Sequence, residues 1–371
     1  MAEQPDSLEA LNEALPLQDK LAAAHGSVRE LFPFIARIAV KIYDAQTNTL
    51  QQYLHSGGGD EPVEDIDLGV SLQELLEKGR PRVISNPLTV EENGPEQNRR
   101  VGRSGYPASY TLPMFNRGEF IGLVFFNSDR KDAFDDHVLR QLSLYGHLIS
   151  LMVIAELPAS RTLAAVTKTI GKVAEAADPE TGSHLDRMSR FARLIAENLK
   201  EKYRLNDSYI EHIYMFSPAL DIGKLGIPKN ILQKPGVLNE EEESLMRTHT
   251  EKGEAMINDL IYHFGLDKIQ YKDVLRNIAA FHHEAVNGSG YPAGLKGDDI
   301  PLEARIVAVA HVFDALTSER PYRDAWSNRD ATAELKRLAG ERLDKDCVAA
   351  LIGNMAEVER IQQEFDENTY I

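Results

Sequence analysis

The stretch FHHEAVNGSGYPAGLKG occupies residues 281–297 and decides how the second half of the chain folds. Two adjacent histidines, His282 and His283, follow an apolar run with helical spacing and precede a turn rich in Gly, Asn and Pro. Successive side chains on an α-helix point about 100° apart, so both imidazoles can reach one ion cluster only where the helix ends or bends. The stretch therefore predicts a helix terminus that carries two candidate metal ligands.

Four other segments of this half carry candidate ligands and phosphate-binding groups. In DPETGSHLDR (178–187), Glu180 and His184 are four residues apart, so on a helix they face the same side and can share one ion. The other candidates are Asp221 and Lys224 in SPALDIGKLGIP (217–228), His249 in MRTHTEKG (246–253), and His311, Asp314, Arg320 and Arg323 in AVAHVFDALTSERPYR (308–323). A single group of this kind is more often an ordinary surface or core contact, but five of the eleven histidines fall in these four segments and the 281–297 stretch taken together. Imidazole and carboxylate ligands without thiolate suit iron, manganese, nickel or zinc.

The composition limits the other functions of the chain. Its 371 residues suggest about two domains, and 41 Lys+Arg against 58 Asp+Glu give a formal net charge of −17 at pH 7. A chain this acidic is a poor candidate for non-specific binding to nucleic acid or to a membrane surface. Cys347 is the one cysteine, which excludes an intramolecular disulfide and a cysteine-based zinc site and fits a reducing cytoplasm. The N-terminus lacks a signal-peptide pattern, and the apolar stretch at 148–157 is too short to span a membrane.

The first half of the chain is predicted to form a sheet. Residues 35–44 alternate apolar and polar side chains, and residues 47–55 can pair with them across a polar turn. Further strands are expected at 81–86, 110–115 and 119–128, the last two joined by a hairpin turn at Asn116–Gly118, with a short helix at 71–79 and loops at 56–67 and 89–106. A longer helix is expected at 134–157.

The second half is predicted to be helical throughout. Helical spacing continues through 160–178, and no convincing strand follows. The expected helices are 183–203, 207–219, 239–263, 270–283, 302–317, 328–339 and 344–363. The second domain is therefore expected to be all-α.

The first domain resembles a GAF domain. The resemblance rests on the closing hairpin RGEFIGLVFFNS (117–128), the helix entry FDDHVLRQL (134–142) and the long exit helix, and it covers about residues 20–155. It implies an α/β sensor fold with a central antiparallel sheet and a small ligand of unknown identity. The alternative is a dimerisation or regulatory module without a ligand, because the cyclic-nucleotide signature of some GAF domains is not recognisable.

The second domain resembles the HD-GYP domains, a subgroup of the HD superfamily of metal-dependent phosphohydrolases. HHEAVNGSGYPAGLKG (282–297) matches the subgroup's HHExxxGxGYPxGLxG pattern at every fixed position, and DIGKLGIP, THTEKG and FDALTSERPYR match as well. The resemblance covers about residues 160–350. It implies hydrolysis of the bacterial second messenger cyclic di-GMP, to pGpG or GMP, at two or three metal ions, usually iron or manganese.

The resemblance also implies a role for each matching residue. Asp221 would bridge two metal ions, and together with Lys224 it would be catalytic. The implied metal ligands are Glu180, His184, Asp221, His249, His282 and His283; Lys224, Arg320 and Arg323 would neutralise phosphate; and Gly290, Tyr291 and Pro292 would form the loop on the guanine side. The implied reaction is attack on phosphorus by water activated at the metals, which also stabilise the developing charge.

Two positions depart from the family pattern. Leu220 stands where the family has the histidine of its name-giving His-Asp pair, and a leucine cannot bind a metal. His311 stands where the family has its last aspartate ligand. The first metal site therefore keeps His184, Asp221 and His311 but lacks one imidazole and one carboxylate, so its metal affinity is expected to fall. The second site, formed by Asp221, His249, His282 and His283, is complete.

The sequence is compatible with three functions. The first is an active cyclic di-GMP phosphodiesterase with an unusual metal centre, which the retained arginines and the intact loop favour. The second is a degenerate domain that binds cyclic di-GMP or a partner protein with little or no hydrolysis. The third is a phosphohydrolase that acts on another nucleotide.

The predicted organisation is a lead-in at 1–20, a GAF-like sensor at 21–150, a connecting helix at 151–177 and an HD-GYP-like domain at 178–371. The continuous helical spacing between the domains predicts that the sensor regulates the second domain through this helix. Helices of this kind often pair with their twins, so a homodimer through the connecting helix is expected, in a cytoplasmic protein.

Overall fold

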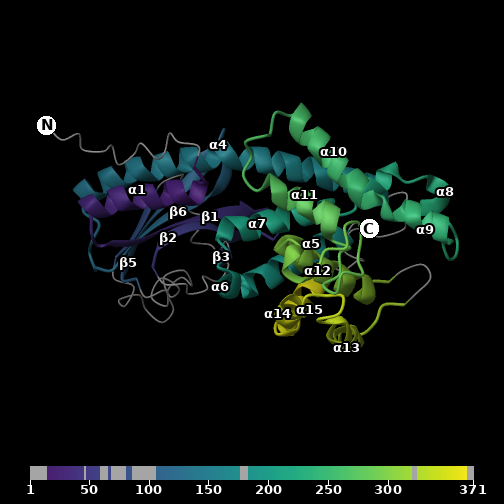
Figure 1. Ribbon diagram of the computed structural model, residues 1–371. Helices are drawn as coiled ribbons and strands as arrows, with labels where there is room; N and C mark the ends of the chain where they lie inside the picture. The colour runs from purple at the N-terminus through teal and green to yellow at the C-terminus, as the bar shows by residue number, and fades with distance from the viewer. Residues whose placement is uncertain are drawn as a thin grey trace. The chain divides into compact units, whose positions relative to one another are not determined.

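The computed structural model describes residues 15–45, 47–58, 66–67, 81–85, 106–175, 183–319 and 324–365 (Figure 1). The chain divides into two compact units, Met1–Pro158 and Ala159–Ile371. The first unit contains a sheet flanked by helices, and the described part of the second unit is helical. The predicted order of an α/β domain followed by an all-α domain is confirmed.

The sheet of the first unit has six antiparallel strands in the order β3-β2-β1-β6-β5-β4. The strands are β1 (Ile35–Asp44), β2 (Thr49–Gly57), β3 (Ile66–Asp67), β4 (Arg82–Ser85), β5 (Ala108–Asn116) and β6 (Glu119–Ser128). The hairpin predicted at Asn116–Gly118 joins β5 to β6, with positive φ angles at Arg117 (51°) and Gly118 (87°). Two left-handed residues in succession make the tight turn that matches the twist of paired strands. The short strand β3 lies in a stretch that was expected to be a loop.

Two helices cover one face of this sheet, as Figure 1 shows. They are α1 (Leu17–Leu31) and α4 (Asp136–Glu175). Leu17 and Leu21 of α1 share a buried cluster with Ile38 and Val40 of β1 and with Leu142 of α4. Burying each of these side chains stabilises the unit by about 2 kcal/mol. Helix α1 therefore begins inside the stretch that was expected to be a lead-in, because its first turn already supplies core side chains.

Helix α4 runs past the end of the first unit without a break, and Pro158 lies in its interior. This confirms the predicted continuous helix. Residues Asp136–Gly171 are long and apolar enough to cross a membrane by length and composition, whereas the apolar stretch predicted at 148–157 was too short for this. The core helix of a soluble domain passes the same test. Leu142, Ile149 and Val153 are buried in the core of the first unit, and 33% of the apolar window of the helix is buried.

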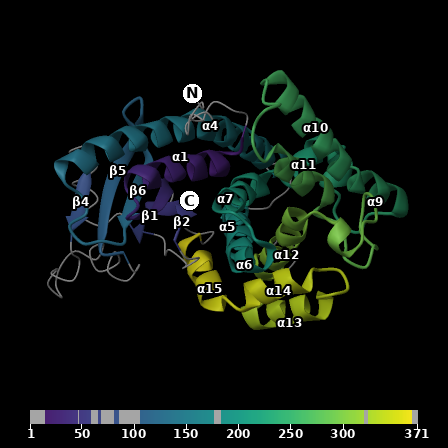
Figure 2. The same ribbon diagram turned by 60° about the vertical axis from the view of Figure 1, so that its left-hand side comes forward.

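The second unit is a bundle of helices, and its described residues contain no strand beyond an isolated bridge between Ala339 and Leu343. Its α-helices after α4 are α5 (Ser183–Asn198), α6 (Lys200–Tyr203), α7 (Asp207–Phe216), α8 (Lys229–Leu232), α9 (Glu240–Arg247), α10 (His249–His263), α11 (Lys272–Phe281), α12 (Leu302–Thr317), α13 (Asn328–Leu338), α14 (Lys345–Ile352) and α15 (Met355–Glu364). Three 3-10 helices, η3 (Ser217–Ala219), η4 (Ile222–Gly226) and η5 (Gly297–Asp299), connect them. The C-terminal helices α13, α14 and α15 lie together (Figure 2).

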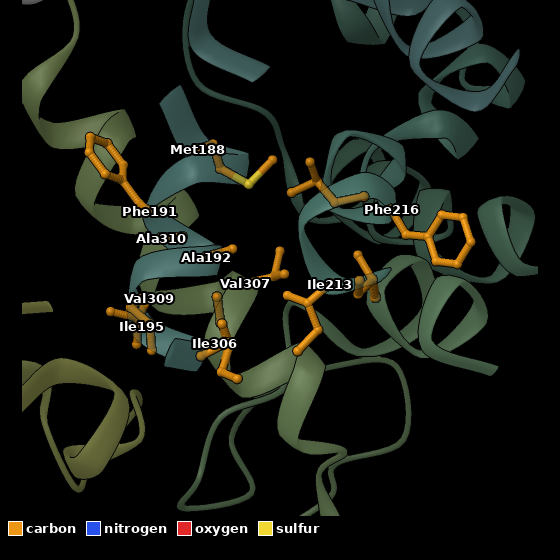
Figure 3. Packing of buried hydrophobic residues seen from close by; sticks show 14 of the residues in the cluster. Met188, Phe191, Ala192, Ile195, Ile213, Phe216, Ile306, Val307, Val309 and Ala310 are labelled. Carbon is orange, nitrogen blue, oxygen red and sulfur yellow. The ribbon is translucent and has the colours of Figure 1, made fainter. Parts of the chain in front are cut away.

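The core of the second unit forms where α5, α7 and α12 meet, as Figure 3 shows. Phe191 of α5 and Phe313 of α12 are both fully buried, and their rings make an edge-to-face contact with centroids 5.3 Å apart. Leu220, one of the two positions that depart from the family pattern, is fully buried in this cluster. This leucine therefore belongs to the apolar core.

Several helices end where no local signal marks a stop. The stretch expected as one helix at 239–263 is two helices, α9 and α10, which meet at Thr248. The Thr248 hydroxyl donates to the Leu245 carbonyl oxygen (2.6 Å), and His249 is buried at the start of α10. No glycine or proline marks this break, so the 3.6-residue spacing alone predicted a continuous helix. The expected helix 183–203 is also divided, whereas the division of the expected helix 344–363 falls at Gly353, a residue type that commonly ends helices. Helix α8 was not expected. The expected helix at 71–79 lies outside the described residues.

Candidate metal centre

Four side chains from distant parts of the second unit converge on one point. One ligand atom each of Asp221, His249, His282 and His283 lies within 4.8 Å of the others. Asp221 precedes η4, His249 begins α10, and the two adjacent histidines follow the last residue of α11. The helix end predicted to let both neighbouring imidazoles reach one ion is therefore present.

A close approach of two backbones brings Asp221 near His249. A Cβ atom on Gly223 would lie 1.9 Å from the His249 carbonyl oxygen and 2.5 Å from the Gly253 nitrogen. Any other residue at 223 would therefore push η4 away from α10. The glycine of the DIGKLG segment thus fixes the spacing between the carboxylate and the first imidazole.

Asp221 is the buried carboxylate of this group. Its Oδ2 atom lies 3.0 Å from Lys224 Nζ, and its Oδ1 atom lies 3.4 Å from His249 Nε2 and 3.7 Å from His282 Nε2. Burial opposes the charge, yet the Lys224 ammonium holds the pKa of Asp221 well below its usual range. Among the described residues no hydrogen bond reaches Oδ1. A buried, ionised carboxylate oxygen without a hydrogen-bond donor fits a cation-binding site.

The imidazoles are oriented by the backbone. His249 Nδ1 lies 2.8 Å from the Met246 carbonyl oxygen, and His282 Nδ1 lies 2.9 Å from that of Ile278. Because a carbonyl oxygen only accepts, each Nδ1 carries the proton, and each Nε2 presents its lone pair toward the centre of the group. Burial lowers the pKa of His249 and, with the neighbouring imidazoles, that of His283. Neutral imidazoles are the form that binds metals.

The loop predicted to face guanine lies beside the same group. The Tyr291 ring stacks on the His283 ring, with centroids 4.7 Å apart and an interplanar angle of 23°. A Cβ atom on Gly290 would lie 2.3 Å from the Ala285 nitrogen, so only glycine fits there. The buried Glu284 carboxylate accepts three backbone hydrogen bonds from the loop, from Ala293 (2.7 Å), Gly294 (3.0 Å) and Leu295 (3.0 Å). Glu284 had no assigned role in the sequence analysis, although it directly follows the histidine pair.

His184 and His311 lie beside this group but outside the four close ligands. The His311 ring on α12 is 5.9 Å from that of His184, 6.1 Å from that of His282 and 6.0 Å from that of His283. Burial lowers the pKa of His311 to about 3, so its imidazole is neutral. The structure thus places His311 among three of the other imidazoles, where the family pattern has a carboxylate.

A buried ion network holds His184. Its Nδ1 donates to the Asp314 carboxylate, which also accepts from Arg187 Nε (2.8 Å) and from the Ser318 hydroxyl (3.0 Å). Burial opposes the charge of Asp314, but His184 and Arg187 hold the pKa of its carboxyl well below the usual range. No local sequence pattern marks this role of Asp314, because its partner lies 130 residues away in the chain.

Three predicted site residues lie outside the described residues. They are Glu180, Arg320 and Arg323. Lys224, Tyr291 and Pro292 are described, and Lys224 contacts the carboxylate of the metal group directly.

Comparisons with known proteins agree with both resemblances. The HD domain model matches residues 152–347, and the GAF domain model matches residues 19–153. The chain is 40% identical over 226 residues to the cyclic di-GMP phosphodiesterase response regulator RpfG of Xanthomonas campestris, covering 61% of this chain and 56% of the relative.

Two relatives from Vibrio cholerae match the chain over a similar length. A probable cyclic di-GMP phosphodiesterase is 40% identical over 192 residues (51% of this chain and 43% of the relative). The 3'3'-cGAMP-specific phosphodiesterase 2 is 38% identical over 183 residues (49% of this chain and 33% of the relative). The chain thus spans about half or less of the length of these relatives. Because the HD domain model covers more than half of this chain, the protein belongs to the HD domain family, with a GAF domain ahead of its HD domain.

Proposed function

We propose that this protein is a metal-dependent phosphodiesterase that hydrolyses cyclic di-GMP to pGpG or GMP. The observation that carries the proposal is the group of Asp221, His249, His282 and His283 beside the Tyr291 loop. Curated relatives at 40% identity are named as cyclic di-GMP phosphodiesterases, which supports this choice of substrate.

The proposed cofactors are two or three transition-metal ions. Iron and manganese are the preferred candidates, and nickel and zinc are the alternatives. Such ions supply Lewis acidity toward phosphoryl oxygens and lower the pKa of a water molecule. The second site comprises Asp221, His249, His282 and His283, while His184, Asp221, His311 and Glu180 are the candidates for the remaining positions. The backbone carbonyls that accept from Nδ1 of His249 and His282 keep these imidazoles in the binding tautomer. Lys224, Arg320 and Arg323 would balance phosphate charge, and Gly290, Tyr291 and Pro292 would contact guanine.

The test combines metal analysis with product analysis on the full chain. The purified protein is expected to retain at least one transition-metal ion per chain. After loading with Fe²⁺ or Mn²⁺ it is expected to convert cyclic di-GMP to pGpG, as followed by chromatography. Protein without metal affinity would contradict every metal-dependent reaction.

Two alternatives keep specific support. Leu220 lies in the apolar core and His311 replaces a carboxylate, so a receptor that binds cyclic di-GMP or a partner protein with little hydrolysis remains the second candidate. A 38% identical relative is named as specific for 3'3'-cGAMP, which favours the same reaction on another nucleotide as the third. Parallel assays with both cyclic dinucleotides, each measured for binding and for turnover, separate the three.

The double variant Leu220→His, His311→Asp tests the departures from the family pattern. It restores one imidazole and one carboxylate, so it is expected to retain one further metal ion per chain and to hydrolyse cyclic di-GMP faster. Because the introduced imidazole would be a polar group in an apolar core, the metal-free variant is expected to melt at a lower temperature than the wild type, and bound metal is expected to recover part of the loss. The His311→Asp single variant is the control for charge alone. Unchanged metal content in the double variant would contradict the proposed loss of ligands.

We also propose that the GAF domain regulates the HD domain in a cytoplasmic homodimer. The proposed organisation is a sensor at 21–150 with a small ligand, a connecting helix at 151–177 and the phosphodiesterase domain at 178–371. The proposed seam begins in the last turns of the sensor range and continues into the connecting helix. Leu144 and Leu151 of α4 are 59% and 63% exposed and lie seven residues apart, which is the spacing of one helix–helix seam. The Leu144→Glu, Leu151→Glu variant is expected to halve the mass measured by light scattering and to change turnover. A monomeric wild type would exclude the dimer.

A further inference from the structure

We propose that Arg247 binds the substrate and selects for a second phosphate group, an inference that rests on the proposed cyclic dinucleotide hydrolysis. Arg247 is the last residue of α9 and stands two positions before His249. Its guanidinium carbon lies 5.1 Å from the centroid of the Tyr291 ring, and that ring stacks on His283 of the metal group. A guanidinium, a phenol and an imidazole therefore form a connected series that ends at the metal ligands.

The exposure of the two cations near this group gives them different tasks. The Lys224 side chain is 16% exposed and contacts Asp221 inside the group. The Arg247 side chain is 49% exposed, so an anion from solution can reach it. Its carboxylate partner, Glu243, is one helical turn away at 2.5 Å and is 53% exposed. Exposed pairs of this kind are weak, so a phosphate can displace the carboxylate.

The chemistry of the substrate calls for such a cation. A cyclic dinucleotide carries two phosphodiester groups, and only the one being cleaved sits at the metal ligands. The other brings a negative charge to the rim of a site in a chain of net charge −17. Arginine presents a planar fork of donors that matches two phosphate oxygens, and contact with an aromatic ring limits the positions the fork can take. Tyr291 thus orients Arg247 as well as facing the base.

The experiment compares two substrates on Arg247→Ala in the full, metal-loaded chain. Cyclic di-GMP has the second phosphate, whereas bis(p-nitrophenyl) phosphate is a single diester. Loss of a charge-assisted contact to phosphate weakens affinity by about tenfold to a hundredfold. The KM for cyclic di-GMP is therefore expected to rise by that factor. Turnover of the single diester and the metal content are expected to stay at wild-type values. Arg247→Lys keeps the charge but lacks the planar fork of donors. Its KM for cyclic di-GMP is expected to lie between those of the wild type and Arg247→Ala.

Arg337→Ala is the matched control, because Arg337 also forms an exposed ion pair with a glutamate on its own helix, Glu334 of α13. The proposal would be overturned if Arg247→Ala lost kcat/KM by the same factor on both substrates. It would also be overturned if the KM of Arg247→Ala for cyclic di-GMP equalled that of Arg337→Ala. Wild-type protein that binds cyclic di-GMP without cleaving it would contradict the proposed hydrolysis alone, and weaker calorimetric binding by Arg247→Ala would still support the contact. Wild-type protein with no affinity for cyclic di-GMP would contradict both.

Discussion

Replacing Asp221 with asparagine is expected to remove the bound metal and to reduce phosphodiester hydrolysis by more than about a hundredfold. Loss of a residue that merely supports a ligand costs about tenfold to a hundredfold in metal affinity or activity, and Asp221 is itself a member of the ligand group. Its Oδ1 atom faces two Nε2 atoms and its Oδ2 atom faces Lys224, so one carboxylate balances the charge of the whole group. An amide has neither the charge nor a second oxygen.

Asp207→Asn provides the control for this variant. Asp207 is also buried and also paired with a lysine, Lys200, but it lies at the start of α7 outside the metal group. Its replacement is expected to lower the melting temperature and to leave the metal content intact. Metal content is measured by mass spectrometry of the purified chains and turnover by chromatography. If Asp221→Asn retained the wild-type amount of metal, the assignment of this carboxylate would be wrong.

Much of the fold could be predicted because local signals mark it. The turn at Asn116–Gly118 is set by two residues that adopt left-handed conformations, and the observed hairpin joins strands on either side of it. Helix α12 spans Leu302–Thr317, the range that was expected, because Pro301 marks its start and apolar residues run through it. The division at Thr248 was not predictable, since its cause is the burial of His249 in a group assembled by tertiary contacts.

Local sequence signals were also insufficient to predict how the site assembles. Spacing within one helix can pair residues four apart. Asp221 and His249 are 28 residues apart, and His282 follows 33 residues later, so only the resemblance to a family brought the three together. The structure adds residues that no local pattern marked. Glu284 holds the loop through three backbone hydrogen bonds, and Asp314 holds His184 from a distant helix. Both act through partners that tertiary folding supplies.

Replacing Asp314 with asparagine is expected to destabilise the second unit by about 3–5 kcal/mol. Removing one partner of a buried pair leaves the other charge without compensation, and Arg187 is buried beside this carboxylate. The variant is also expected to weaken metal binding by about tenfold to a hundredfold. The Asp314 carboxylate accepts the hydrogen bond from His184 Nδ1–H and so sets the tautomer of that imidazole. Unfolding can be followed through Trp326, the single tryptophan, which lies in this unit.

The pH dependence of this loss follows from the direction of the Asp314 pKa shift. The folded-state pKa lies below the unfolded value of about 3.9, so the carboxylate contributes its full stability above that value and loses it as the pH falls. The difference in unfolding free energy between wild type and Asp314→Asn is therefore expected to be constant from about pH 6 to 8 and to shrink below about pH 4.

Asp346→Asn is the control, because Asp346 pairs with the exposed Lys202 and its loss is expected to cost less than about 1 kcal/mol. Adding Arg187→Gln to Asp314→Asn is expected to recover part of the loss, because both charges then leave the interior together. A difference in unfolding free energy that did not change with acidity, or a double variant as unstable as the sum of the two single ones, would contradict a charge pair at this position.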